Sequence, residues 1–251
     1  MSGHSKWSSI KHKKGAADAK RGQLFSKLSR AIIVAAKEGG GDPSGNIALQ
    51  NAIEKARSYS MPKDNIERAI AKGAGEGAGA QAFEIVIYEG YGPAGVAIIA
   101  ETLTDNRNRT ASDVRHTFSK HGGNLGTDGS VAWMFERRGV VLVPSDGVDE
   151  DELMMAAADG GADDVSVESA SFEVLCAPEA LWTVREAIAA AGFAAESAEL
   201  MMVPKTTVEV SDESAARRIV KLVEALEELD DVQDVYANFD IPESLLETIA
   251  T

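Results

Sequence analysis

The chain has 251 residues, with 25 Lys and Arg against 40 Asp and Glu, and a formal net charge of −15 at pH 7. Its single cysteine, Cys176, excludes an internal disulfide and a zinc site built from several cysteines. No apolar stretch approaches the ~20 residues of a membrane-spanning helix, and the basic N-terminus lacks the apolar core of a secretory signal. We therefore expect a cytoplasmic protein of one or two domains that does not enter a membrane.

The first thirty residues reverse the charge of the chain. They contain one acid, Asp18, and eight basic residues: Lys6, Lys11, Lys13, Lys14, Lys20, Arg21, Lys27 and Arg30. A polyanion would be attracted to this segment and repelled by most of the remaining chain. The pattern leaves two interpretations open, a nucleic-acid contact or a solvated charged tail.

One aromatic side chain, Trp7, stands among these lysines, next to Ser and His residues. Its indole could stack on an unpaired base while the hydroxyl groups donate to phosphates. The alternative is a hydrophobic anchor that holds the segment on the helices that follow. The candidate nucleic-acid-binding residues are Lys6, Trp7, Lys11, Lys13, Lys14, Lys20, Arg21, Lys27 and Arg30.

Helical spacing of apolar residues predicts a first helix over residues 15–37, with basic side chains gathered on the opposite face. Turn residues then end it, and further helices are expected over residues 47–58 and from Pro62 onward. Short connections favour a three-helix bundle. A Gly-rich linker at residues 73–79 predicts that this first domain covers residues 1–80.

Beyond the linker the pattern changes to strands. Residues 83–89 and 95–101 are predicted to form a hairpin, although residues 90–95 match the dinucleotide-binding string G-x-G-x-x-G. A strand follows this string where a phosphate-binding helix would be needed, so the hairpin is favoured. A helix ended by Gly122 and Gly123 and a strand over residues 130–135 are expected next.

The remaining elements alternate between strand and helix. Residues 139–203 read as β-α-β-β-α-β, the order of a ferredoxin-like domain. A further strand, a helix and a strand at residues 232–238 would complete the sheet that begins at residue 83. The predicted fold is thus α+β, with a bundle at 1–80, a central α+β domain at 81–138 with 204–251, and an inserted ferredoxin-like domain at 139–203.

Motifs that support catalysis are not found in the sequence. There is no phosphate-binding P-loop and no G-x-S-x-G nucleophile motif, and His116 and His121 are too far out of phase on one helix to share a metal. Cys176 lies in an apolar run that favours a buried structural thiol. We expect no enzyme activity, no metal or other cofactor and no small-molecule substrate.

A second, weaker group of cations follows the hairpin: Arg107, Arg109, Arg115, Lys120, Arg137 and Arg138. Four acids share this span, so the sequence leaves local ion pairing and ligand contact equally open.

Several strings together resemble one family of proteins. They are GHSKW (residues 3–7), IKHK (10–13), DAKRG (18–22), GGGDP (39–43), MPKDNIERAI (61–70), YEGYGP (88–93), TDNRNRT (104–110), HGGNLG (121–126) and SVAWMF (130–135). The chain is similar along its whole length to the YebC family, described as probable transcriptional regulatory proteins. The resemblance implies three domains and nucleic-acid binding without catalysis.

The family resemblance implies two different roles. Some members resemble DNA-binding transcriptional regulators, while the mitochondrial translational activator of cytochrome c oxidase and others are tied to the ribosome, notably at proline-rich stalls. We therefore expect a regulator that binds DNA through the basic segment. The alternative is a translation factor that binds ribosomal RNA on the ribosome, with a basic protein partner on the acidic domains. The absence of a helix-turn-helix recognition helix favours the alternative.

Overall fold

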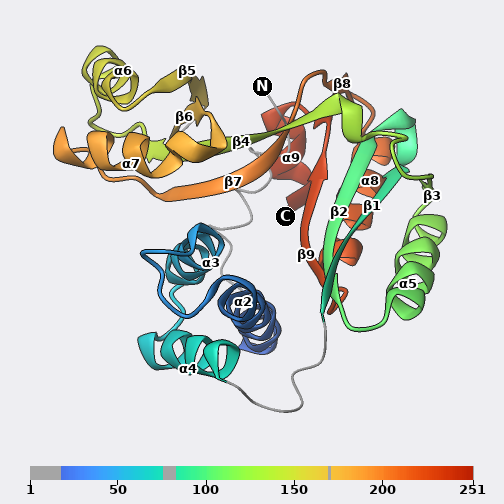
Figure 1. The fold of residues 1–251 in the computed structure, drawn as a ribbon. Coiled ribbons are helices and arrows are strands. Elements are labelled where there is room, and N and C mark those ends of the chain that lie inside the picture. The colour runs from blue at the N-terminus through green and yellow to red at the C-terminus, as the bar shows by residue number, and fades with distance from the viewer. Residues whose placement is uncertain (1–17, 76–82, 169–170, 251) are drawn as a thin grey trace. The chain divides into compact units, whose positions relative to one another are not determined.

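The computed structural model describes residues 18–75, 83–168 and 171–250, and its fold is mixed α+β, as predicted (Figure 1). The chain divides into two compact units, the first with residues 1–34, 76–136 and 203–251 and the second with residues 35–75 and 137–202. This division differs from the expected one because helix α2 (Asp18–Gly39) contributes to both units. The three-domain division at residues 80, 138 and 203 stays a prediction.

The first unit is built on a four-stranded sheet with the strand order β3-β1-β2-β9. Its strands are β1 (Glu84–Tyr91), β2 (Ala97–Thr104), β3 (Asn124–Leu125) and β9 (Val232–Ala237). Strands β1 and β2 are antiparallel and joined through the 3-10 turn η1 (Pro93–Gly95), which confirms the hairpin. Strand β9 pairs with β2 as predicted, but the strand expected after residue 204 does not join this sheet.

Helices α5 (Arg107–Lys120) and α8 (Glu213–Glu227) pack on one face of this sheet (Figure 1). Phe118 of α5 and Leu222 of α8 are fully buried in the shared core. The core also takes Leu246 from α9 (Glu243–Ala250), a helix that the sequence analysis did not predict. Two short strands, β8 (Val208–Glu209) and β10 (Phe239–Asp240), pair parallel with each other outside the main sheet.

The predicted strand over residues 130–135 is wrong. This segment contains the 3-10 turn η2 (Ala132–Met134), and strand β4 (Phe135–Pro144) begins only after it. The backbone N–H groups of Val131 and Ala132 donate to the carboxylate of Glu89. Since a side chain takes these donors, the segment does not pair with a neighbouring strand.

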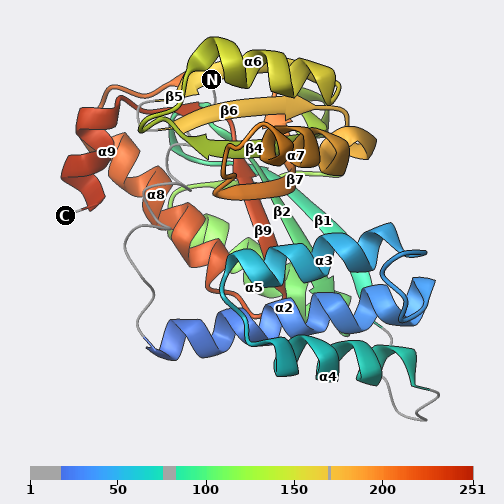
Figure 2. The same cartoon turned by 90° about the vertical axis from the view of Figure 1, so that its left-hand side faces the viewer.

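The second unit contains the ferredoxin-like arrangement (Figure 2). In chain order its elements are β4, α6 (Glu150–Asp159), β5 (Ala162–Glu168), β6 (Ser171–Cys176), η3 (Pro178–Ala180), α7 (Leu181–Ala190) and β7 (Ser197–Pro204). The strand order β5-β6-β4-β7 is that of the predicted β-α-β-β-α-β unit. Leu153 of α6 and Leu181 of α7 share one core with the apolar face of the sheet.

Helices α3 (Ile47–Ser58) and α4 (Lys63–Ala74) also belong to the second unit. Buried Asn46 caps α3 by accepting from Leu49 N, and its amide donates to Ala35 O and Gly40 O at 2.8 Å each. Trp182 Nε1 on α7 donates to Asn51 Oδ1 on α3 at 2.9 Å. These bonds join the helical segment to the ferredoxin-like elements within one unit.

Candidate nucleic-acid interface

The predicted nucleic-acid-binding residues divide into those that the structure describes and those that it does not. Five lie outside the described residues: Lys6, Trp7, Lys11, Lys13 and Lys14. Lys20 lies in the first turn of α2, but its side chain is also outside the described part. Arg21, Lys27 and Arg30 therefore remain to be placed, and all three lie on α2.

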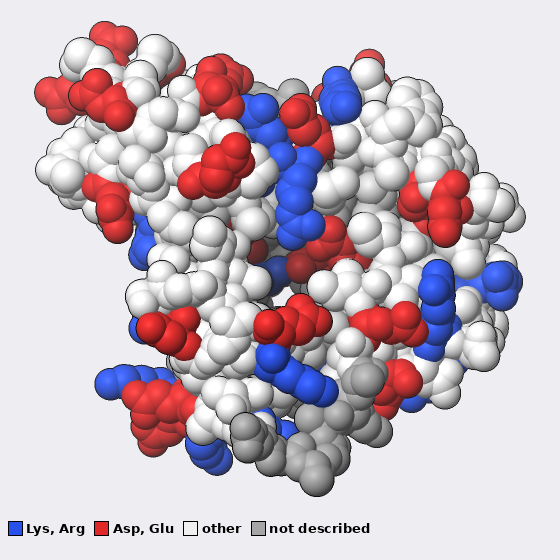
Figure 3. All heavy atoms as spheres, in the orientation of Figure 1, with Lys and Arg blue, Asp and Glu red and all other residues white. Residues whose placement is uncertain are grey.

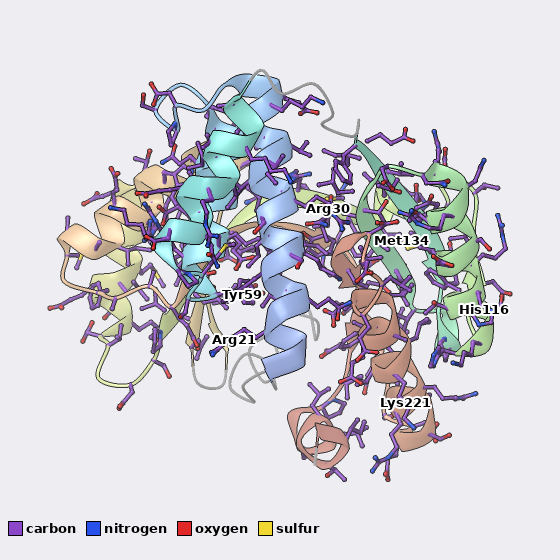
Figure 4. All side chains as sticks on the ribbon, turned by 90° about the horizontal axis from the view of Figure 1, so that it is seen from below. Arg21, Arg30, Tyr59, His116, Met134 and Lys221 are labelled. Atoms are coloured by element: carbon purple, nitrogen blue, oxygen red, sulfur yellow. The ribbon has the colours of Figure 1, made fainter. Side chains whose placement is uncertain are left out.

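Arg21 and Arg30 lie on opposite sides of α2 (Figure 4). They are nine positions apart, which at 100° per residue is half a turn out of phase. Arg21 is exposed, and it forms no ion pair with any residue that the structure describes. Arg21 therefore stays available for a phosphate contact.

Lys27 and Arg30 are engaged within the first unit, against the expectation that they bind phosphate. Lys27 is only 8% exposed, and its Nζ donates to Glu227 O at 2.6 Å. Arg30 donates to Asp230 O at 3.1 Å and to Asp231 Oδ1 at 3.2 Å, and its guanidinium carbon lies 5.3 Å from the centroid of the Phe83 ring. Both side chains would have to leave these partners to reach a nucleic acid.

The partner of this α2 face is the C-terminal end of helix α8. Gln23, Lys27 and Arg30 recur at helical spacing, and Gln23 Nε2 donates to Glu228 O at 2.7 Å and to Asp230 Oδ1 at 2.9 Å. The last carbonyl groups of a helix lack intrahelical donors and carry partial negative charge, so they favour cations. A basic helix face can bind either these carbonyl groups or phosphates, and the sequence pattern does not distinguish these two kinds of partner.

Asp231 joins this contact to the start of helix α5. Its Oδ2 accepts from Arg109 Nη2 and from Thr110 Oγ1 at 2.7 Å each, and from Thr104 Oγ1 at 3.3 Å. Burial alone would raise the pKa of the Asp231 carboxyl, but the hydrogen bonds from Arg109 and Thr110 and the charges of Arg109 and Arg30 outweigh it and lower that pKa. The segment TDNRNRT (residues 104–110) thus builds a buried polar network around one carboxylate.

A second buried carboxylate, Glu89 on β1, holds the loop before β4. Glu89 is 7% exposed and accepts from Gly129 N at 2.6 Å and from Val131 N and Ala132 N at 2.7 Å each. Burial alone would raise the pKa of Glu89, but these three backbone donors together lower it. Glu89 is not recognisable as a functional residue from the sequence, because its partners lie some forty positions away in the chain.

Two aromatic side chains, Trp133 of the loop held by Glu89 and Tyr91 at the end of β1, share one anchoring point. Trp133 is 66% exposed and Tyr91 is 36% exposed. Trp133 Nε1 and Tyr91 Oη donate to the same carbonyl oxygen, that of Ser130, at 3.2 Å and 3.1 Å. Two exposed rings anchored at one point are suited to stacking on a planar group such as a nucleobase.

The sequence predicts a structural role for the single thiol and no metal site. Cys176 is fully buried, its thiol donates to Gly139 O at 3.6 Å, and burial raises its pKa. Within residues 18–75, 83–168 and 171–250, no three His, Cys, Asp or Glu side chains are placed to hold a metal ion. None of the helices in these ranges has the length and apolar character to span a membrane.

Two family models match most of the chain. The model described as the TACO1/YebC protein N-terminal domain matches residues 5–76, and the model for the TACO1/YebC second and third domain matches residues 83–239.

Similar proteins cover the chain from end to end. A probable transcriptional regulatory protein of Rubrobacter xylanophilus is 58% identical over 250 residues, and one of Syntrophobacter fumaroxidans is 55% identical over 250 residues. Both alignments cover 100% of each chain. A crystal structure of a conserved hypothetical protein from Aquifex aeolicus is similar with a TM-score of 0.80 and 52% identity, over 90% of this chain and 93% of that one.

Proposed function

The chain belongs to the TACO1/YebC family, and on this premise we propose that it is a regulatory protein that binds nucleic acid through its basic N-terminal segment. The proposal needs no catalytic step, no metal and no cofactor. We propose that the protein acts in the cytoplasm and that the acidic remainder of the chain binds a basic protein partner.

The reversal of charge in the first thirty residues carries the proposal. Eight basic residues and one acid open a chain whose total charge is −15. Neutralising phosphates releases counterions from the nucleic acid, and this release drives binding that does not depend on sequence. Because most of the remaining chain repels a polyanion, the basic segment also fixes which end of the protein binds.

The contacts of α2 narrow the set of phosphate-binding residues. Because Lys27 and Arg30 are bound to the α8 end and to Asp231, we assign them a positioning role. They hold the first part of α2 on the sheet-bearing part of the first unit, while Lys20 and Arg21 at the start of α2 and the residues before the helix bind the ligand. The proposed contacts are Lys6, Lys11, Lys13, Lys14, Lys20 and Arg21, with Trp7 stacked on a base.

The first candidate ligand is duplex DNA. It is supported by the names of the relatives from Rubrobacter xylanophilus and Syntrophobacter fumaroxidans, which are probable transcriptional regulatory proteins. A lysine-rich segment grips the backbone of any duplex, so we expect broad sequence tolerance with a strong salt dependence.

The test is the salt dependence of binding for the full chain and a variant with Lys6, Lys11, Lys13 and Lys14 changed to Gln. For duplex DNA each lost phosphate contact reduces the slope of log K against log salt by about 0.9, so the variant should lose up to about 3.6. A control removes two exposed cations of α4, Lys63 and Lys72. Equal slopes of log K against log salt for wild type and the four-lysine variant would contradict the proposal.

The second candidate is a translation factor that binds RNA on the ribosome. The exposed Trp133 and Tyr91 rings favour it, since ribosomal RNA offers unpaired bases for stacking and duplex DNA does not. Sedimentation of cell extracts on sucrose gradients tests it. Co-migration with ribosomal subunits, lost at high salt, is expected for this candidate, and absence from them at every salt concentration contradicts it.

A further inference from the structure

The structure separates the second basic group of the sequence into paired and unpaired members. Arg109 Nη2 lies 2.8 Å from Asp105 Oδ1 and 2.7 Å from Asp231 Oδ2, and Arg138 is paired with Asp163. Arg115 and Lys120, in contrast, are exposed and form no ion pair with any described residue. Ion pairing therefore accounts for only some of these cations, and helix α5 carries Arg115 and Lys120 at its surface.

The outward face of α5 is polar and cationic. Its buried face consists of Thr110, Val114, Thr117 and Phe118, which fixes the opposite side toward solvent. That side carries Ser112, Arg115, His116, Ser119 and Lys120, all exposed, and Asp113 is the one acid in the helix sequence. Figure 4 shows His116 pointing outward from α5, and Lys and Arg side chains stand on the surface over this helix at the right of Figure 3.

Helix α8 adds a further cation to this face. The end of α5 lies against α8, since a Cβ atom on Gly123 would be 3.1 Å from both Phe118 and Leu222. Exposed Lys221 directly precedes Leu222 (Figure 4). Burial and the charges of Lys120 and Lys221 lower the pKa of His121, so both ammonium groups act on one imidazole.

We propose that this face, formed by Arg115, His116, Ser119 and Lys120 of α5 with Lys221 of α8, is a second nucleic-acid contact that binds the sugar–phosphate backbone. Guanidinium and ammonium groups pair with phosphate oxygens, and hydroxyl and imidazole groups donate hydrogen bonds to them. In a chain of net charge −15, a cationic face attracts a polyanion that most of the chain repels. The inference rests on the proposed function and extends it beyond the N-terminal segment.

The face is suited to the backbone and not to base-specific readout. Its donors come from two helices that are fixed to the sheet by the shared core, so the positions of these donors are fixed as well. Three cations correspond to about three phosphate contacts, and each changes the salt slope by about 0.9 on duplex DNA or about 0.7 on a single strand. The arrangement predicts that binding to this face adds to that of the N-terminal segment.

The test uses the full chain with Arg115, Lys120 and Lys221 changed to Gln. Binding to a fluorescent 20-base-pair DNA and to a single-stranded RNA is measured by anisotropy at several salt concentrations. We expect the slope of log K against log salt to fall by about 2.7 for the duplex or about 2.1 for the single strand. A control with Lys63, Arg68 and Lys72 of α4 changed to Gln loses the same charge and should keep the wild-type slope.

Two comparisons keep the outcome decisive. A variant that exchanges Arg115 for Lys and Lys120 for Arg keeps the charge and should keep the slope, whereas equal slopes for wild type and the Gln variant overturn the inference. An equal fall in the α4 control overturns it too, because the effect would then reflect net charge alone. If the wild-type chain binds neither nucleic acid, both the proposed function and this inference fail. If binding is lost only in the N-terminal lysine variant, the proposed function stands and only this inference fails.

Discussion

Replacing Glu89 with Gln changes a buried carboxylate into an amide of nearly the same size, and its partners make the cost calculable. Oε2 receives the N–H groups of Val131 and Ala132, and Oε1 receives that of Gly129. The amide keeps one oxygen. In its best orientation this oxygen accepts from Val131 and Ala132, and the NH2 group of the amide then faces Gly129. The N–H group of Gly129 then has no acceptor on this side chain, and the hydrogen bonds from Val131 and Ala132 lose their charge assistance.

The cost follows from these three bonds. Each bond that changes from a charged to a neutral acceptor loses about 1 kcal/mol, and a donor without its partner costs about 1–3 kcal/mol. Gly129 is exposed, so water can replace its acceptor and the lower figure applies. The sum is about 3 kcal/mol, which corresponds to about 100-fold more frequent opening of the loop.

Hydrogen–deuterium exchange of peptides that cover residues 126–135 measures this opening. The matched control is Glu84→Gln, because Glu84 lies on the same strand with an exposed side chain. We expect exchange to be about 100-fold faster in E89Q and unchanged in E84Q, while peptides from β2 keep their protection. Wild-type exchange rates in E89Q would refute the assignment of Glu89 as the residue that positions Trp133.

Three further predictions concern the first unit. Asp231→Asn should lower the free energy of unfolding at neutral pH. The difference from wild type should shrink as the pH falls through the lowered pKa of Asp231, because the stabilising carboxylate is fully present above the ordinary value of 3.8 and is lost on protonation. Urea unfolding at several pH values measures this difference. Lys221→Gln should raise the pKa of His121 toward its ordinary value, as followed by NMR titration, because one of the charges that lower it is removed. Gly90→Ala should cost about 1–3 kcal/mol in thermal unfolding, because its Cβ would lie 2.6 Å from a backbone oxygen and 2.7 Å from a buried ring, whereas Gly45→Ala, with open space around its Cβ, should cost less than about 1 kcal/mol.

Each of these predictions has an outcome that contradicts it. A difference between D231N and wild type that does not change with pH would show that the charge of this carboxylate is not what stabilises the network. An unchanged His121 pKa in K221Q would show that the charge of Lys221 does not act on this imidazole. Equal unfolding temperatures for G90A and wild type would contradict the close packing of β1 on α5.

Local patterns predicted most of the elements because their causes are local. The helix over Ile47–Ser58 follows from apolar spacing and the Asn46 cap, and the hairpin from the turn at residues 90–95. Alternating strands and helices also identified the ferredoxin-like unit, whose sheet order the structure confirms. Helix α9 was not predicted because it has only eight residues, and its burial depends on the core of the first unit.

The site was harder to predict because its partners are distant in sequence. A basic face on α2 is equally suited to a phosphate or to carbonyl groups, and Lys27 finds its acceptor 200 residues away at Glu227. The segment at residues 130–135 has the composition of a strand, but Glu89 takes its backbone donors. The sequence does not show which cations of α5 are ion-paired, because the pairing of Arg109 depends on the position of Asp231.

The most direct test is crosslinking of nucleic acid to the chain in living cells, followed by sequencing of the attached fragments. Wild-type protein is compared with the variant in which Lys6, Lys11, Lys13 and Lys14 are Gln, and with the α4 control that lacks Lys63 and Lys72. We predict that the four-lysine variant recovers far less nucleic acid while the control matches wild type. Undiminished recovery by the four-lysine variant would contradict the claim that the N-terminal cations hold the ligand.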